Sequence, residues 1–144
     1  MKPADFVKAL GVAILVMALD LVCAFCTVSI WAMLTGAQGL TPADPKVIEV
    51  SSLSTRVCGP LLFALLVWIF QRKRPDRSVF GFAFAVFGFY FLIDWGVGAM
   101  AAKANPQGPS ATAAMLQPAV LATMALKLLG ALVGAWLARP RRRE

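Results

Sequence analysis

FVKALGVAILVMALDLVCAFCTVSIWAML, residues Phe6–Leu34, is an apolar run with a single carboxylate, Asp20, near its centre. A helix that crosses a lipid bilayer needs about 20 predominantly apolar residues, and this run is longer than that. A charge at the centre of such a helix costs about 2.5–3.5 kcal/mol on insertion scales, so it is tolerated where a partner or a water-filled cavity receives it. We therefore expect Asp20 to face the interior of a helical bundle.

The last apolar run, Gln117–Ala138 (QPAVLATMALKLLGALVGAWLA), carries the opposite charge, Lys127, at its midpoint. Two opposite charges at matching depths in the first and last runs would neutralise each other inside the bundle. The sequence therefore predicts an ion pair between Asp20 and Lys127, which would join the two ends of the chain.

The segments between the first and last apolar runs also fit a protein with several transmembrane helices. Three polar segments separate the apolar runs. The first, residues 36–55, is a polar connection, and the second, QRKRPDRS at Gln71–Ser78, is a basic turn. The third, Lys103–Thr112, is a loop rich in Pro and Gly. Hydrophobic residues make up 60% of the 144 residues, against about 45–50% in soluble domains even when glycine is included. Short connections between helices favour antiparallel neighbours. We expect an all-α integral membrane protein, one domain over 1–144, folded as an antiparallel up-down bundle of four transmembrane helices at about 6–34, 53–70, 79–102 and 117–138.

The net charge of +7 is concentrated at the ends of these runs, chiefly in Arg72–Arg77 and Arg139–Arg143. Basic residues in such places orient a membrane protein and contact anionic lipid headgroups. With Lys2 and Lys8 they indicate that both termini lie in the cytoplasm and that the protein belongs to the bacterial cytoplasmic (inner) membrane. Nothing in the sequence resembles a base-stacking or groove-reading module, so we expect no binding to nucleic acid.

Two more charges fall within the apolar runs, Asp94 and Arg56. At a rise of 1.5 Å per residue, Asp94 lies roughly 6 Å and Arg56 roughly 10 Å outward of the membrane centre. The simplest arrangement is a second ion pair between Asp94 and Arg56. In the alternative, both carboxylates surround Lys127, and the side chain of Arg56 extends to the interface. These four residues form the predicted intramembrane charge network.

Polar and small side chains share helix faces with these charges. Candidate polar lining residues of the bundle interior are Cys23, Thr27, Tyr90 and Thr123. The motif Gly130-x-x-x-Gly134 permits close contact with another helix. These patterns are typical of helix packing.

The sequence offers little for catalysis. It contains no histidine, the commonest general base and metal ligand. Cys23 and Cys26 lie within a helix, and Cys58 is expected well outward of both, so we interpret all three as packing residues. We predict no catalytic residues, no cofactor, no metal site and no enzymatic activity.

Two functions remain. The first is a bundle without catalytic activity that acts through helix–helix association, as a homo-oligomer or an accessory subunit of another membrane protein. The alternative is a small proton- or cation-coupled transporter using Asp20 and Asp94, because ionisable residues inside membranes often mark such pathways. A water-accessible cavity reaching Asp20 would distinguish the second function from the first.

Overall fold

The computed structural model describes residues 2–37, 39, 41, 43–73, 78–104 and 110–139. Within these ranges all regular structure is helical. The helices are α1 (Pro3–Thr35), α2 (Pro45–Arg72), α3 (Val79–Ala104), α4 (Ala111–Met115) and α5 (Pro118–Leu137). All except α4 are long and apolar enough to cross a membrane. The basic residues predicted to contact lipid at 74, 77 and 141–143 lie outside the described residues.

α2 begins at Pro45, well before the start predicted near residue 53. Asp44 is the N-cap, and its carboxylate accepts a hydrogen bond from the backbone N–H of Lys46 at 3.3 Å. Proline is favoured at the first helical position because its missing N–H would have no partner there. The segment that we expected to be a polar connection therefore supplies more than two turns of α2. The short helix α4 was not predicted either; Ser110 caps it by accepting from the N–H of Ala113 at 3.2 Å.

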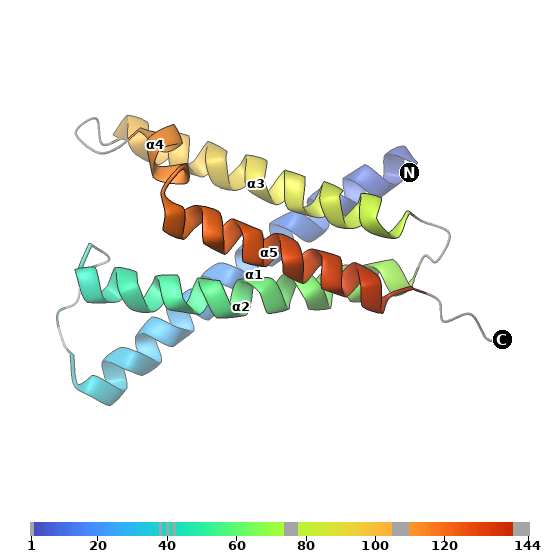
Figure 1. Cartoon of the computed structure of the whole chain (residues 1–144). Coiled ribbons are helices and arrows are strands. Elements are labelled where there is room, and N and C mark those ends of the chain that lie inside the picture. The colour runs from blue at the N-terminus through green and yellow to red at the C-terminus, as the bar shows by residue number, and fades with distance from the viewer. Residues whose placement is uncertain are drawn as a thin grey trace.

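The four long helices pack as a ring in the order α1, α2, α5, α3, and α3 in turn contacts α1. Across the ring, α2 and α3 touch only slightly, and α1 and α5 make no direct backbone approach in the described residues. Figure 1 shows that successive long helices run in opposite directions. One end of the molecule, the core end, carries Pro3, Arg72, Val79 and Leu137. The opposite end, the open end, carries Thr35, Pro45, Ala104 and Pro118.

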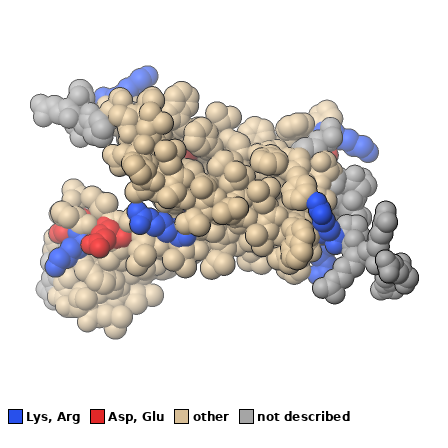
Figure 2. All heavy atoms as spheres, viewed as in Figure 1, with Lys and Arg blue, Asp and Glu red and all other residues tan. Residues whose placement is uncertain are grey.

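The buried core lies towards the core end. Its residues are Ala9, Val12, Ala13, Val16, Phe63, Leu66, Val67, Phe82, Ala83, Val86, Tyr90, Ala131 and Ala135. At the open end the last turns of α1 and of α3 diverge (Figure 1), and the surface is hollowed between them (Figure 2). The molecule is therefore closely packed at one end and open at the other.

α2 and α5 make the most extensive contact between helices, and two glycines of α5 bring their backbones together. A Cβ atom added at Gly130 would overlap the main chain of Pro60, and one added at Gly134 would overlap the main chain of Ala64. The close approach that the Gly130-x-x-x-Gly134 motif predicts is confirmed, and its partner is α2. Because the contact is backbone against backbone, it fixes the register of the two helices.

Candidate functional site

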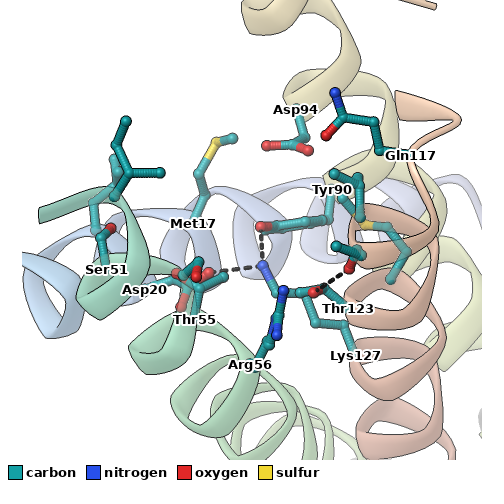
Figure 3. Close-up of a pocket in the computed structure, with 16 residues that line it drawn as sticks. Met17, Asp20, Ser51, Thr55, Arg56, Tyr90, Asp94, Gln117, Thr123 and Lys127 are labelled. Atoms are coloured by element: carbon teal, nitrogen blue, oxygen red, sulfur yellow. Dashed lines mark hydrogen bonds and ion pairs between the residues drawn. The ribbon is translucent and has the colours of Figure 1, made fainter. Parts of the chain in front are cut away.

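The centre of the molecule holds a buried polar cluster of three residues from three helices. Lys127 of α5 donates one hydrogen bond to Oδ2 of Asp20 on α1, at 2.8 Å, and another to the hydroxyl of Tyr90 on α3, at 2.5 Å. Asp20 is 7% exposed, Lys127 2% and Tyr90 3%. Figure 3 shows both contacts as dashed lines meeting at the ammonium nitrogen. The ion pair expected between Asp20 and Lys127 is thus present in the structure.

This pair bridges the diagonal of the helix ring. α1 and α5 do not pack on each other in the described part of the chain, so the long side chain of Lys127 spans the interior to reach Asp20. Gly59 of α2 leaves room for it, since a Cβ atom there would come within 2.6 Å of the Lys127 Cε atom. Phe63 holds the Tyr90 ring in an edge-to-face contact, with ring centroids 5.1 Å apart. α2 therefore positions two members of the cluster without contributing a polar group to it.

A cavity of about 620 Å³ lies between the helices on the open-end side of this cluster. Its polar lining comprises Asp20, Ser51, Ser52, Thr55, Arg56, Tyr90, Asp94, Gln117, Thr123 and Lys127. Its apolar walls are formed by Met17, Leu21, Ile48, Ala119, Val120 and Met124. The core residues begin on the other side of the cluster. The three clustered residues thus form the floor that separates the cavity from the core.

The predicted pair between Asp94 and Arg56 is not formed. Both residues line the cavity, but among the described residues neither makes an ion pair or a hydrogen bond. The alternative arrangement is observed in part: Lys127 contacts Asp20 and Tyr90, acts on Asp94 electrostatically without contacting it, and Arg56 is exposed. Tyr90 lies one helical turn from Asp94 and occupies the place beside the ammonium group. In the view of Figure 3, Asp94 and Gln117 lie on one side of the cluster and Arg56 on the other.

Two of the four candidate lining residues lie elsewhere. Tyr90 and Thr123 line the cavity, whereas Cys23 and Thr27 lie at the contact between α1 and α2. The Thr27 hydroxyl donates to the Cys23 carbonyl at 2.8 Å, which leaves the buried Ser54 hydroxyl to donate to Thr27 at 2.9 Å. Cys58, one turn after Ser54, lies beside Cys23. The expectation that Cys58 lies well outward of Cys23 is therefore wrong, because the Thr27–Ser54 contact aligns the two helices at that depth.

The cavity also contains residues that the sequence did not single out, namely Ser51, Ser52, Thr55 and Gln117. The first three belong to turns of α2 that we had assigned to a loop or to the very start of the helix. The signal that would have identified them is Asp44-Pro45, an N-cap residue followed by proline. With α2 started there, these hydroxyl groups fall on successive turns of one helix.

Removing the hydroxyl contact between α1 and α2 should destabilise the protein slightly. In a double-mutant cycle of Thr27→Val and Ser54→Ala, we expect a coupling free energy of about 0.6 kcal/mol and no more than about 1.7, as for other hydrogen bonds between membrane helices. Unfolding in mixed micelles measures it. Thr123→Val is the matched control, because the Thr123 hydroxyl donates to Ala119 of its own helix. A coupling energy of zero would show that the contact contributes nothing.

Metal ligands do not gather at this site: the described residues include no group of three or more His, Cys, Asp or Glu side chains that could hold an ion. The polar groups instead consist of one buried ion pair, a tyrosine, two further charges of opposite sign, and hydroxyl and amide groups. Such a set binds through hydrogen bonds and charge. No family model, curated protein or solved structure matches this chain.

Proposed function

We propose that the protein spans the bacterial cytoplasmic membrane as an antiparallel up-down bundle of four helices, with both termini in the cytoplasm. The four long apolar helices support the insertion. Figure 2 supports the orientation across the bilayer, since charged side chains gather towards the two ends, with a broad, largely uncharged surface between them. The distribution of basic residues supports a cytoplasmic position for the core end, because basic residues are enriched on the cytoplasmic side of membrane proteins. The described basic residues near that end are Lys2, Lys8, Arg72, Lys73 and Arg139, and those near the open end are Lys46, Arg56 and Lys103.

Aromatic side chains accompany the basic ones at the core end. The Arg139 guanidinium lies 4.5 Å from the centroid of the Phe80 ring, and that of Arg72 lies 5.6 Å from the Trp68 ring. Trp in particular is enriched where a membrane meets water, and cations there interact with anionic headgroups. These pairs support the placement of the core end at the cytoplasmic interface.

We infer that the bundle takes up a small cationic group from the outer side of the membrane, as a proton- or cation-coupled transporter. The observation that carries this function is the polar cavity that extends from the open end to the buried cluster of Asp20, Lys127 and Tyr90. If the ion pair served only to hold helices together, we would expect packed side chains on all sides of it, as in the core. Instead, the cavity lies on one side of it. Asp94 is the group that would receive the cation, because it lines the cavity and makes no ion pair with a described cation, Lys127 acting on it only at longer range.

Asp20 has a different role in this proposal. Its partner Lys127 lies within the same chain, so the pair fixes the floor of the cavity and is not exposed for recognition by another membrane protein. Association with a second copy or with another protein stays a prediction from the sequence. The cavity favours the transport function over it.

Transport should depend on Asp94. In proteoliposomes we expect Asp94→Asn to lower proton or sodium flux at least ten-fold, because a hydrogen bond to a charged group contributes about 1.5–3 kcal/mol. Flux is followed with dyes for each ion, with and without a dialysable extract of small bacterial metabolites outside. Glu49→Gln is the matched control, since Glu49 lies on α2 outside this cavity. Equal flux through Asp94→Asn and the unchanged protein, or none above empty liposomes, would contradict the proposal.

A further inference from the structure

The cavity presents two charges of opposite sign, and neither makes an ion pair or a hydrogen bond within the described chain, although Lys127 acts on Asp94 electrostatically without contacting it. Asp94 is half-buried on α3, and Arg56 is exposed on α2. Figure 3 places them on different sides of the Asp20–Lys127–Tyr90 cluster. Charged side chains inside a membrane protein normally pair with one another or reach water. Here they are held apart by a floor that is itself electrically neutral.

A second carboxylate faces the same space. Asp20 lines the cavity and is more than nine-tenths buried, yet its Oδ1 atom accepts no hydrogen bond within the described residues. Only Oδ2 is used by Lys127. Burying an acceptor without a hydrogen bond costs free energy, so a buried site with such an atom favours a ligand that donates to it. Acceptors for a donor group therefore exist at the floor and at Asp94, and a strong donor exists at Arg56.

We propose that the cavity binds a small zwitterion, with its ammonium group at Asp94 and its carboxylate or phosphate group at Arg56. This inference rests on the proposed transport function and names its solute: the cationic group taken up by Asp94 is one end of a neutral molecule. A guanidinium binds carboxylate and phosphate groups through two parallel hydrogen bonds. The apolar walls, among them Met17 and Val120, suit a short aliphatic segment between the two charged groups.

The charges of the cavity favour a zwitterion over a simple ion. A lone cation at Asp94 would leave Arg56 without a counter-charge. A lone anion at Arg56 would leave Asp94 without one and would be repelled by it. A molecule that carries both charges satisfies both residues and adds no net charge to the membrane interior. A volume of about 620 Å³ lies within the range of roughly 300–1,000 Å³ that is usual for small-molecule sites.

The same chemistry occurs in free amino acids and in the headgroup of phosphatidylethanolamine, so the test has two arms. In the first, the full chain in phosphatidylglycerol nanodiscs is titrated calorimetrically with straight-chain amino acids from glycine to 6-aminohexanoate. Butylamine and butyrate, each with a single charge, are the comparison compounds. In the second arm, phosphatidylethanolamine is added to the nanodiscs and the titration is repeated.

We expect one length of amino acid to bind at least ten-fold more tightly than butylamine or butyrate. Asp94→Asn and Arg56→Gln should each weaken that binding by about ten-fold, since each removes one charge-assisted contact. The matched controls are Glu49→Gln and Lys46→Gln, which remove an acid and a base outside the cavity, and they should bind as the unchanged protein does. Competition by phosphatidylethanolamine would identify the lipid headgroup as the source, and no competition would identify a free solute.

Equal binding of the compounds with one charge, or equal loss in the control variants, would overturn the zwitterion site. Melting temperatures are measured for every variant. Should Asp94→Asn melt lower than the unchanged protein, the Arg56→Gln arm decides, because Arg56 is exposed and bonded to no described residue. Selective binding without flux would overturn the transport function and leave this site standing. Ion flux without selective binding of amino acids would overturn the zwitterion site and leave the transport function standing.

Discussion

Lys127→Ala is expected to lower the free energy of unfolding by about 3–5 kcal/mol, the cost of leaving a buried carboxylate without its cation. Asp20 is 7% exposed and accepts a hydrogen bond from Lys127 through Oδ2, with the Tyr90 hydroxyl also within reach of the carboxylate. The variant also leaves the Tyr90 hydroxyl without its donor. We expect a low folded yield in detergent and a melting temperature well below that of the unchanged protein.

Two compensated variants separate charge from packing. The exchange of Asp20→Lys with Lys127→Asp should restore much of the yield, since the pair is kept with its direction reversed. The combination of Asp20→Leu with Lys127→Met should melt near or above the unchanged protein, because replacing a buried ion pair by apolar residues of similar volume is often neutral or stabilising. If Lys127→Ala alone melted like the unchanged protein, the pair would have no structural role.

Gly130→Ala should separate α2 from α5 and lower the free energy of unfolding. Overpacking a core typically costs about 1–3 kcal/mol, and we expect a larger loss here. The added methyl group would overlap the main chain of Pro60, which cannot move aside as a flexible side chain does. Adding Gly134→Ala, which meets the main chain of Ala64, should abolish the native contact. Thermal unfolding in detergent and folded yield measure both effects.

Gly88→Ala is the matched control for this prediction. Gly88 also lies within a long helix, but a Cβ atom there would meet nothing within 4 Å. Alanine has the higher helix propensity by up to about 1 kcal/mol, so this variant should be as stable as the unchanged protein or slightly more stable. A similar loss in Gly88→Ala and Gly130→Ala would show that glycine matters for the helices themselves and not for their contact.

The sequence was sufficient to predict the Asp20–Lys127 pair because depth along a helix follows directly from residue number. The same reasoning failed for Asp94 and Arg56, since depth does not say which side of the bundle a side chain faces. Their helices, α3 and α2, lie on the second diagonal of the ring and meet through the Phe63 and Tyr90 rings, whereas the ion pair in the described residues bridges the first diagonal. Tyr90, one turn from Asp94, takes the place beside that lysine.

The lining of the cavity was hidden for a more local reason. Hydropathy locates the apolar part of α2, but the helix begins where Asp44 and Pro45 satisfy or remove its first N–H groups. A boundary placed by hydropathy alone therefore omitted Ser51 and Ser52, which line the site. Likewise, the relative depth of Cys23 and Cys58 depends on how α1 and α2 slide past each other, which the Thr27–Ser54 hydrogen bond sets.

The uneven packing of the bundle has an electrical meaning if the open end faces the outside. Water in the cavity would carry the outer potential down to the Asp20–Lys127–Tyr90 floor, so the voltage across the membrane would fall mainly over the apolar core. Each unit charge moved through 100 mV takes about 2.3 kcal/mol. An ion released inward would gain or lose this electrical free energy, depending on the sign of its charge, over a few helical turns. A molecule whose charges cancel would cross without electrical work.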